Sequence, residues 1–344
     1  MAYTTINKST DYFNTKLYTG NGGTNAITGV GHQPDWNWIK CRSHADSSQI
    51  FDVLRTTYAL RSDGTNAEAV GNGWTSLDSD GFTLNGDSSG GNVNNSGRTY
   101  ASWNWKANGA GSVDSSTGSI SATVSANATA GFSIIKFTNP SSGNFTIPHG
   151  LGVAPDMLIF KCSGGVQSWF VLHKDLSSFT DRYLRLQTTA SEITYTMQSQ
   201  APTSTLLYLN SGGVSNGNTE TICYAFSSKT GYSKHDSYTG NGNADGTFVY
   251  TGFKPAFVIT KANLSNRNWV ILDNKRLGYN DKNYRLFPNL NNAEDTTSGI
   301  VDFTSNGFKF RSNNNVVNES SVTYIYMAFG QSLVGSNNVP CTAR

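Results

Sequence analysis

The side chains that most often carry out catalysis or bind metals are few and scattered in this chain of 344 residues. The five histidines are His32, His44, His149, His173 and His235, and no two of them have the spacing of a zinc site. The sequence contains no nucleophile elbow of the GxSxG type, no HExxH helix and no glycine-rich phosphate loop. We therefore expect no catalytic residue, no cofactor and no metal.

Two acidic patterns could still support chemistry. Glu68, Glu192 and Glu294 occupy matched places along the chain, and glycoside hydrolysis requires a pair of carboxylates. Matched placement favours a structural role, so a carbohydrate-active enzyme is the weaker alternative. Residues 241–246 have the acidic and amide side chains of a calcium-binding loop, but Gly252 stands where that loop needs a bidentate Glu.

Tryptophan is the residue whose placement best fits a binding role, because exposed indole rings stack against apolar faces of ligands. Five of the seven tryptophans fall in the first third of the chain: Trp36, Trp38, Trp74, Trp103 and Trp105. The alternating pairs at 36 and 38 and at 103 and 105 must each point to one face of a strand. These five residues form a candidate surface for a ligand or partner, and packing in a core is the alternative.

The elements that would position these side chains come in three copies. Three segments share a Gly, a Pro three residues later and a Lys six residues after the Pro: Gly31, Pro34 and Lys40; Gly152, Pro155 and Lys161; Gly252, Pro255 and Lys261. Strand-forming residues lie between each Pro and Lys, which predicts a turn followed by a buried strand. We interpret these nine residues as the scaffold of an internal repeat.

Further matches follow each copy of this motif. Asp52, His173 and Asp273 each lie eighteen residues after the proline, and we expect this position to make a side-chain hydrogen bond within each copy. The second and third copies also share Arg185 and Arg285, which could pair with the matched glutamates. Aromatic strands close the copies at residues 100–105, 222–226 and 324–329.

Short strands at regular spacing, with turn signals between them and almost no helical periodicity, predict an all-β fold. We expect three tandem β-sandwich units of the jelly-roll or concanavalin-like type. The predicted division is residues 1–107 for the first repeat, 108–129 for a linker and strand, 130–230 for the second repeat, 231–332 for the third and 333–344 for a C-terminal tail. The Gly/Ser-rich linker predicts that the first unit is hinged against a stiffer pair formed by the other two.

Composition narrows the classes of function. The formal net charge is +2, and no basic cluster of the kind used to bind nucleic acid appears. The N-terminus lacks the pattern of a signal peptide, and no apolar run reaches the length of a membrane span. We expect a protein made in a cytoplasm, without nucleic-acid or membrane partners. Its cysteines, Cys41, Cys162, Cys223 and Cys341, are expected to be reduced and mostly buried.

Several longer stretches resemble a family of repeat-containing virion structural proteins found in marine tailed phages, including those of cyanobacteria. The similarity rests on residues 14–22, 150–155, 231–234, 237–246 and 333–340, and on the Gly-x-x-Pro-Asp element of the first two copies. The third copy departs from the pattern, because Ala256 replaces the aspartate found at Asp35 and Asp156. The resemblance implies a virion component with concanavalin-like or jelly-roll domains and implies no catalytic residues.

This resemblance leads to three alternatives for function. The first is a tail fibre or appendage that attaches to other virion proteins and contacts host surface glycans, and a homotrimer is favoured because linked weak sites gain avidity. The second is a capsid decoration protein. The third and weakest is a carbohydrate-active enzyme, so we expect that the protein is not an enzyme.

Overall fold

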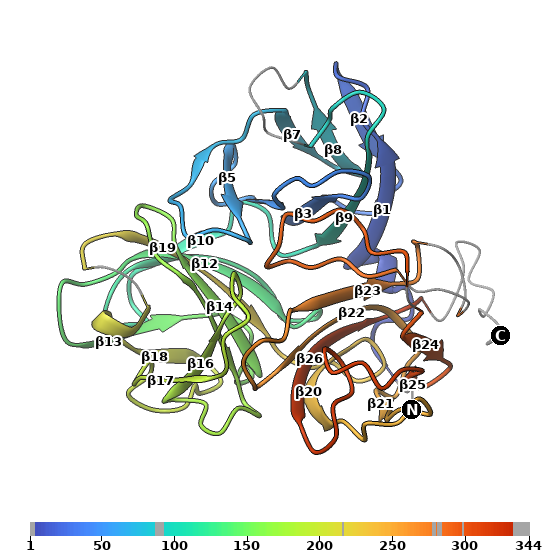
Figure 1. Ribbon diagram of the computed structural model, residues 1–344. Helices are drawn as coiled ribbons and strands as arrows, with labels where there is room; N and C mark the ends of the chain where they lie inside the picture. Colours follow the sequence, from blue (N-terminus) through green and yellow to red (C-terminus); the bar gives the residue numbers. More distant parts are fainter. Residues whose placement is uncertain are drawn as a thin grey trace.

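The chain is almost entirely β-structure. The computed structural model describes residues 4–86, 93–214, 217–276, 280, 284–297 and 299–332. Strands make up 44% and helices 2%, in several separate antiparallel sheets, which confirms the prediction of an all-β, sandwich-type fold. Figure 1 shows the strands in three groups around a common centre, coloured blue, green to yellow, and orange to red.

The elements follow one another as short strands with two brief helical turns. Those of the first group are η1 (Ser9–Asp11), β1 (Phe13–Thr19), β2 (Asn25–Thr28), β3 (Trp36–Cys41), β4 (Gln49–Asp52), β5 (Tyr58–Arg61), β6 (Ala69–Val70), β7 (Trp74–Asp78), β8 (Gly81–Leu84) and β9 (Thr99–Trp105). Those of the second are β10 (Ser112–Asp114), β11 (Ala122–Asn127), β12 (Phe132–Thr138), β13 (Asn144–Pro148), β14 (Met157–Cys162), β15 (Trp169–His173), β16 (Arg182–Arg185), β17 (Ile193–Thr194), β18 (Leu206–Asn210), α1 (Ser211–Val214) and β19 (Glu220–Phe226). Those of the third are β20 (Ser233–Thr239), β21 (Phe248–Tyr250), β22 (Pro255–Ala262), β23 (Val270–Asp273), β24 (Val301–Thr304), β25 (Gly307–Phe310) and β26 (Thr323–Gly330).

Three large sheets share one strand order. The first large sheet has the order β1-β9-β3-β4-β5-β6, the second β10-β11-β12-β19-β14-β15-β16-β17 and the third β20-β26-β22-β23. Within them, β1-β9-β3-β4, β12-β19-β14-β15 and β20-β26-β22-β23 correspond, and their registers define matched residues. For example, Asp52 opposite Trp36 matches His173 opposite Met157 and Asp273 opposite Phe257.

Each large sheet packs one face against a small sheet. The small sheets are β2-β8-β7, β13-β18 and β21-β25-β24, in the order of the large sheets they cover. A separate hydrophobic core fills each of these three interfaces, with Phe82, Leu207 and Phe308 contributed by the small sheets. Each large sheet and its small sheet therefore form a sandwich.

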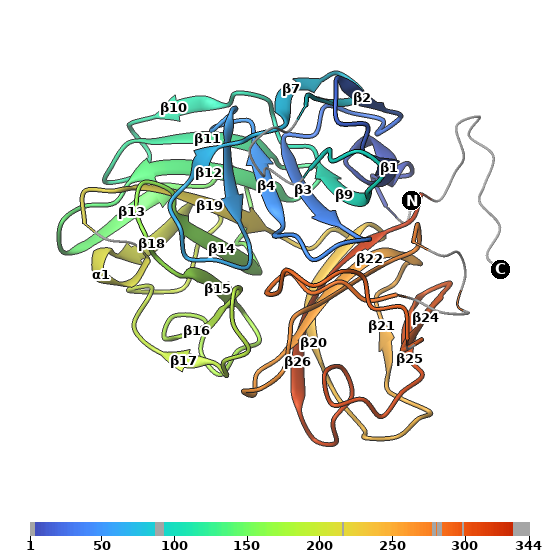
Figure 2. The same cartoon turned by 45° about the horizontal axis from the view of Figure 1, so that its top comes forward.

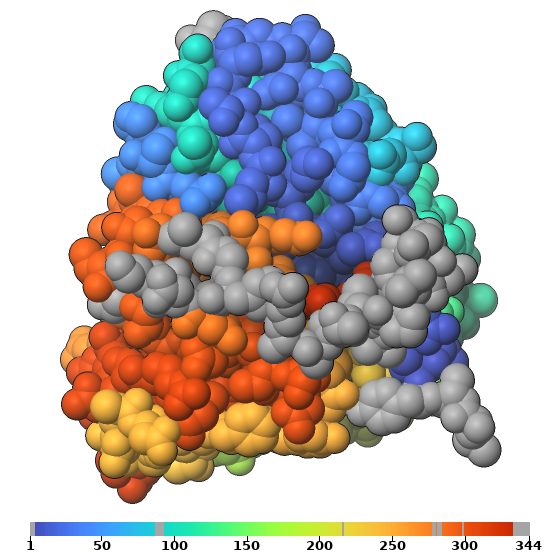
Figure 3. All heavy atoms as spheres, turned by 90° about the vertical axis from the view of Figure 1, so that its right-hand side faces the viewer, coloured from blue at the N-terminus to red at the C-terminus, as the bar shows by residue number. Residues whose placement is uncertain are grey.

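The opposite faces of the three large sheets meet in one central core. It contains Trp36 and Trp105 from the first sheet, Tyr224 from the second, and Phe257 and Phe329 from the third. The ring of Trp36 lies 4.6 Å from that of Tyr224, and the ring of Trp105 lies 5.6 Å from that of Phe257. Figure 3 shows the blue N-terminal part seated directly on the orange C-terminal part. The three sandwiches share this core, and the division of the chain into three tandem units stays a prediction.

This shared core explains why the central strands are apolar on both faces. In β3, Trp36 and Trp38 face the central core, whereas Ile39 and Cys41 face the small sheet. All six residues of β3 are buried, as are all six of β14. A strand enclosed on both sides has no solvent face, so its sequence does not alternate between apolar and polar residues.

The expected hinge after the first unit is wrong. Residues 108–129 form β10 and β11, which pair with each other and extend the second large sheet beyond β12, as Figure 2 shows. The hydroxyl of Ser125 accepts a hydrogen bond from Asn108 N (2.9 Å) and donates one to Gly109 O (2.6 Å). The junction is therefore anchored to a sheet, and the central core spans it.

The motif glycines provide a matched pair for a stability measurement. Gly31 has a φ of 95° and Gly152 a φ of 73°, so alanine is strained at both. A Cβ at Gly31 would lie 2.7 Å from the carbonyl oxygen of Thr10, whereas at Gly152 nothing lies within 4 Å. We expect Gly152→Ala to lower the free energy of unfolding by about 1–2 kcal/mol. Gly31→Ala should lower the free energy of unfolding by a further ~1–3 kcal/mol, measured by urea denaturation. Equal losses of stability in the two variants would contradict the close contact at Gly31.

Candidate functional site

The predicted tryptophan surface is wrong for four of its five residues. Trp36, Trp38, Trp103 and Trp105 have no exposed surface and lie in the central core. Alternation does place each pair on one face of its strand, but the other two large sheets cover that face. A face that packs against another copy of the repeat has the same sequence pattern as a face that binds a ligand.

Trp74 lies instead in the core between the first large sheet and its small sheet, and 7% of its surface is exposed. Its ring is stacked between Phe51, at a centroid distance of 4.1 Å, and Phe82, at 5.4 Å. Both faces of the indole are covered, so a sugar ring cannot stack on it. The edge of Trp74 nevertheless lines a surface pocket.

This pocket, which we call the Trp74 pocket, has a volume of ≈ 470 Å³ and combines apolar walls with a hydroxyl-bearing rim. It is lined by Gln33, Val53, Thr56, Thr57, Trp74, Thr75, Ser76, Leu77, Gly109 and Ala110. Thr56 has a φ of 42°, a strained conformation for a β-branched residue and one that tends to occur at binding sites. The pocket offers hydroxyl and amide groups beside the apolar Val53 and Leu77, which suits a polyol ligand.

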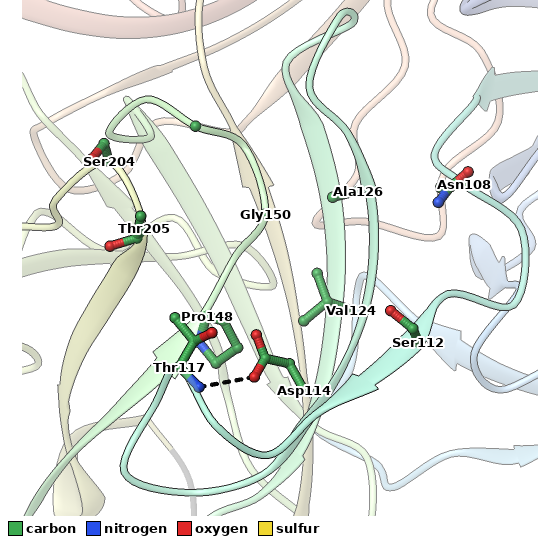
Figure 4. A pocket seen from close by; sticks show the side chains of 11 residues that line it. Asn108, Ser112, Asp114, Thr117, Val124, Ala126, Pro148, Gly150, Ser204 and Thr205 are labelled. Carbon is green, nitrogen blue, oxygen red and sulfur yellow. Dashed lines mark hydrogen bonds between the residues drawn. The ribbon is translucent and has the colours of Figure 1, made fainter.

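A second pocket, the Asp114 pocket, opens beside the β10–β11 hairpin and has a volume of ≈ 380 Å³. Figure 4 shows Ser112, Asp114, Val124 and Ala126 on one wall, with Gly150, Ser204 and Thr205 opposite. Backbone N–H groups of Ser116 and Thr117 donate to Asp114 Oδ1 at 3.0 and 2.9 Å. Hydrogen bonds from Thr117 and Ser116 lower the pKa of Asp114 to about 2, so its carboxylate is charged at neutral pH. One carboxylate lines this pocket, whereas glycoside hydrolysis uses two.

The two pockets lie next to each other on the surface. Gly109 and Ala110 line the Trp74 pocket, and Asn108 and Ser112 line the Asp114 pocket. A chain segment spans at most ~3.3–3.6 Å per residue, so these linker residues are close neighbours. Residues 108–112 therefore form a ridge between two hydroxyl-lined hollows, which sequence reasoning located only as a linker.

Two of the three scaffold lysines bond to a neighbouring group of strands, whereas Lys261 Nζ donates to Ala262 O (2.6 Å) and Leu264 O (2.9 Å) of its own group. Lys40, Lys161 and Lys261 are all buried. Lys40 Nζ donates to Leu290 O at 2.7 Å, and Lys161 Nζ donates to Thr65 O at 3.1 Å. Burial lowers the pKa of Lys161 to about 8.

The motif glycines Gly31, Gly152 and Gly252 all have positive φ. Pro34 and Pro155 precede β3 and β14, and Pro255 begins β22.

We use the word seam for the contact between two neighbouring large sheets. The matched glutamates make the same backbone bond at all three seams: the N–H groups of Glu68, Glu192 and Glu294 donate to the carbonyls of Ser163 (2.9 Å), Asn263 (3.0 Å) and Arg42 (2.8 Å). These bonds join the first sheet to the second, the second to the third and the third to the first. The large sheets therefore form a closed ring.

The expected match between Arg185 and Arg285 is wrong. Val171 pairs with Leu184, and Ile271 forms a bridge with Leu286. Arg185 therefore follows the matched leucine, whereas Arg285 precedes its own. Arg285 forms an ion pair with Asp295, and Arg185 O accepts the indole N–H of Trp269 at 3.0 Å. Equal spacing from the prolines does not give equal positions, because the intervening turns differ.

The matched position at Asp52, His173 and Asp273 makes the expected side-chain hydrogen bond in each copy. Asp52 Oδ1 accepts the N–H of Leu54 at 3.0 Å, and Asp273 Oδ1 accepts that of Lys275 at 3.0 Å. His173 Nδ1 accepts the N–H of Asp175 at 3.2 Å. This confirms the structural interpretation of the recurrence.

Two seams also contain buried ion pairs that were not predicted from the sequence. Arg55 lies 2.7 Å from Asp52, whose Oδ2 accepts the hydroxyl of Tyr224 from the second sheet at 2.7 Å. In the third sheet Arg276 lies 2.7 Å from Asp273, whose Oδ2 accepts the indole N–H of Trp103 from the first sheet at 3.0 Å. The repeated spacing Asp-x-x-Arg was the available signal.

The family of the chain is shown by a match to one family model, the Domain of unknown function (DUF7483), over residues 8–332. The chain belongs to this family. Neither the search of curated proteins nor the search of solved structures found a match.

The DUF7483 match includes the three large sheets, their seams and both pockets, so these features are parts of one family domain.

Among the residues that the structure describes, no helix is long and apolar enough to cross a bilayer. Cys41, Cys162 and Cys223 are buried free thiols, as expected, and Cys341 lies outside the described residues. No group of three or more ligating side chains is arranged for a metal within the described ranges.

The calcium-like segment of the DUF7483 domain forms a turn whose asparagine side chains bind its own backbone. Asn241 Oδ1 accepts the N–H of Asn243 at 3.0 Å, and its amide donates to Asp245 O at 3.1 Å. The carboxylate of Asp245 lies 3.0 Å from Lys309 Nζ. These bonds account for the Asn and Asp residues of the segment through turn geometry.

Proposed function

We propose that this protein is a non-catalytic structural component of a tailed-phage virion, a tail fibre or appendage that binds virion proteins and contacts host surface glycans. The observation that carries the proposal is the closed ring of large sheets around one core. Its buried arginines and lysines bind the chain's own carboxylates and carbonyls, as a rigid scaffold requires. The sequence resemblance described above supports the same role.

The ridge at residues 108–112 and its two pockets are the proposed glycan contact. Sugar hydroxyls both donate and accept hydrogen bonds, and the pockets offer hydroxyls at Thr57, Ser76, Ser112 and Thr205. The charged Asp114 adds a strong acceptor. An oligosaccharide that crosses the ridge could fill both hollows at once.

Filling either pocket should therefore weaken glycan binding. Ala110 and Ser112 are exposed, so Ala110→Arg and Ser112→Arg can be made without disturbing a core. We expect each to weaken binding of host surface polysaccharide at least tenfold by calorimetry. Val166→Arg is the control, because Val166 is 68% exposed and lines neither pocket. Equal binding by all four proteins would contradict the proposed contact.

The position of the protein on the particle separates the appendage from the capsid decoration alternative. Three matched seams around a central core also suit a site on a threefold axis of a capsid. Antibody labelling of purified virions should give signal over the tail, and signal over the head would overturn the appendage role.

Light scattering tests the predicted homotrimer of 37.1 kDa chains. Release of sugars from host polysaccharide would instead favour an enzyme.

A further inference from the structure

The seam between the second and third large sheets lacks the ion pair that seals the other two. At the matched positions, His173 replaces Asp52 and Asp273, and Leu176 replaces Arg55 and Arg276. Met327 of the third sheet stands where Tyr224 and Trp103 donate to the aspartates in the other seams. The side chain of Met327 has no N–H or O–H group to donate to His173, and Leu176 cannot form the ion pair that Arg55 and Arg276 form with their aspartates.

Buried polar atoms without partners gather at this seam instead. His173, on β15, and His235, on β20, have no exposed surface. His173 Nε2 and both ring nitrogens of His235 have no hydrogen-bond partner among the described residues. Each such atom loses its hydrogen bonds to water on folding, so this seam is less stable than one whose polar groups are paired.

Charged groups lie near the two histidines just before β14, just after β15 and on β20. Asp175 Oδ2 lies 3.8 Å from His173 Nδ1, and Lys174 Nζ lies 3.1 Å from Asp156 Oδ1. Asp236, next to His235 on β20, is paired with Lys234 at 3.0 Å. On His173, His235 and Lys174 disfavour a proton, whereas Asp156 and Asp236 favour one; on His235, Asp156 favours a proton and Lys174 disfavours it. These carboxylates would stabilise a protonated histidine, but the imidazole rings are buried behind them.

We propose that the seam between the second and third large sheets is an acid-sensitive joint, which opens when His173 and His235 take up protons. The inference does not depend on the virion role. Opening would separate β15 from β20 and leave the two seams with Asp-Arg pairs closed. The ring of large sheets would then open at one defined place.

The direction of the pH effect follows from the pKa shifts. Burial lowers the pKa of His173 to about 3 and that of His235 to about 4. An unfolded histidine titrates near ~6.5, so the neutral forms stabilise the seam above that pH, and this stabilisation is lost as the pH falls toward ~4. Burial raises the pKa of Asp175 to about 6, so protonation of this carboxyl group opposes the effect of the histidines. Two histidines lose stabilisation as the pH falls, whereas one carboxyl group gains it.

Amide hydrogen exchange of the intact protein, corrected for intrinsic rates, tests the joint. Between pH 7 and pH 4.5 we expect exchange in Trp169–His173 and Ser233–Thr239 to rise at least tenfold. The matched strands Gln49–Asp52 and Phe13–Thr19 should change less than threefold. A rise of the same size in all four segments, or no rise in β15 and β20, would overturn the proposal.

A double variant tests whether the histidines cause the change. His173→Asn keeps a neutral acceptor where the matched residues are aspartates, and His235→Ile copies Ile134, the matched residue of β12. The double variant should lose the acid-induced rise in β15 and β20. His149→Asn is the control, because His149 is equally buried but bonds to Thr203 O, away from this seam, so its rise should match the wild type. An unchanged rise in the double variant would also overturn the proposal.

Discussion

Replacing Trp36 with Ala is expected to lower the free energy of unfolding by about 4 kcal/mol. Trp36 is fully buried, and its ring lies 4.6 Å from Tyr224 and 5.7 Å from both Phe132 and Phe226 of the second sheet. Removing it leaves a cavity that the rigid strands on three sides cannot fill. Its indole N–H has no partner among the described residues, so the loss comes from packing rather than from a hydrogen bond.

Urea denaturation followed by circular dichroism measures this loss. Val166→Ala is the control, since Val166 is 68% exposed and its truncation should change the stability by less than about 0.5 kcal/mol. A loss below about 1 kcal/mol for Trp36→Ala would mean that the central core is not tightly packed.

The second large effect is expected at the seam between the first and second sheets. Arg55→Leu copies Leu176, the natural residue at the matched position, but leaves the carboxylate of Asp52 buried and unpaired. Arg55 Nε donates to Asp52 Oδ2 at 2.7 Å, and the arginine side chain is 1% exposed. We expect the single variant to lose about 3–5 kcal/mol, because an uncompensated buried charge remains.

The double variant Asp52→His/Arg55→Leu should recover a large part of this loss, since it copies the uncharged pair His173 and Leu176. Arg311→Leu is the control: its ion pair with Asp302 is half-exposed and should contribute less than about 1 kcal/mol. If the double variant is less stable than Arg55→Leu, the cost does not come from the unpaired carboxylate.

Much of the fold could be predicted from the sequence, because strand-forming residues and turn residues recur at fixed spacing. The strands around Trp36, Met157 and Phe257 are where the Gly-x-x-Pro motif places them. The motif glycines Gly31 and Gly152 have the positive φ that a tight turn needs. Local signals of this kind depend on neighbouring residues, which the sequence contains directly.

The burial of Trp103 and Trp105 could not be predicted in the same way. Their alternation along the strand shows that they share a face. Whether that face meets solvent depends on sheets more than a hundred residues away in the sequence. The prediction of a hinge at residues 108–129 was wrong for a related reason. A Gly/Ser-rich segment is flexible alone, yet here Ser125 and the β11 backbone bind it to the second sheet.

The candidate site was the least predictable part. Ala110 and Ser112 carry no chemical signal of their own, and the two pockets exist only because the linker folds between separate sheets. The buried ion pairs had a local signal in Asp52 and Arg55, three residues apart. Their role across a seam depended on Tyr224, far along the chain.

Differential scanning calorimetry tests most directly the central claim that three large sheets form one body around a shared core. We predict one transition at neutral pH, with a calorimetric enthalpy equal to the van't Hoff enthalpy, because no sandwich can unfold without exposing the cores of the others. Two or three separate transitions, or a calorimetric enthalpy two to three times the van't Hoff value, would contradict the claim and indicate independent sandwich units.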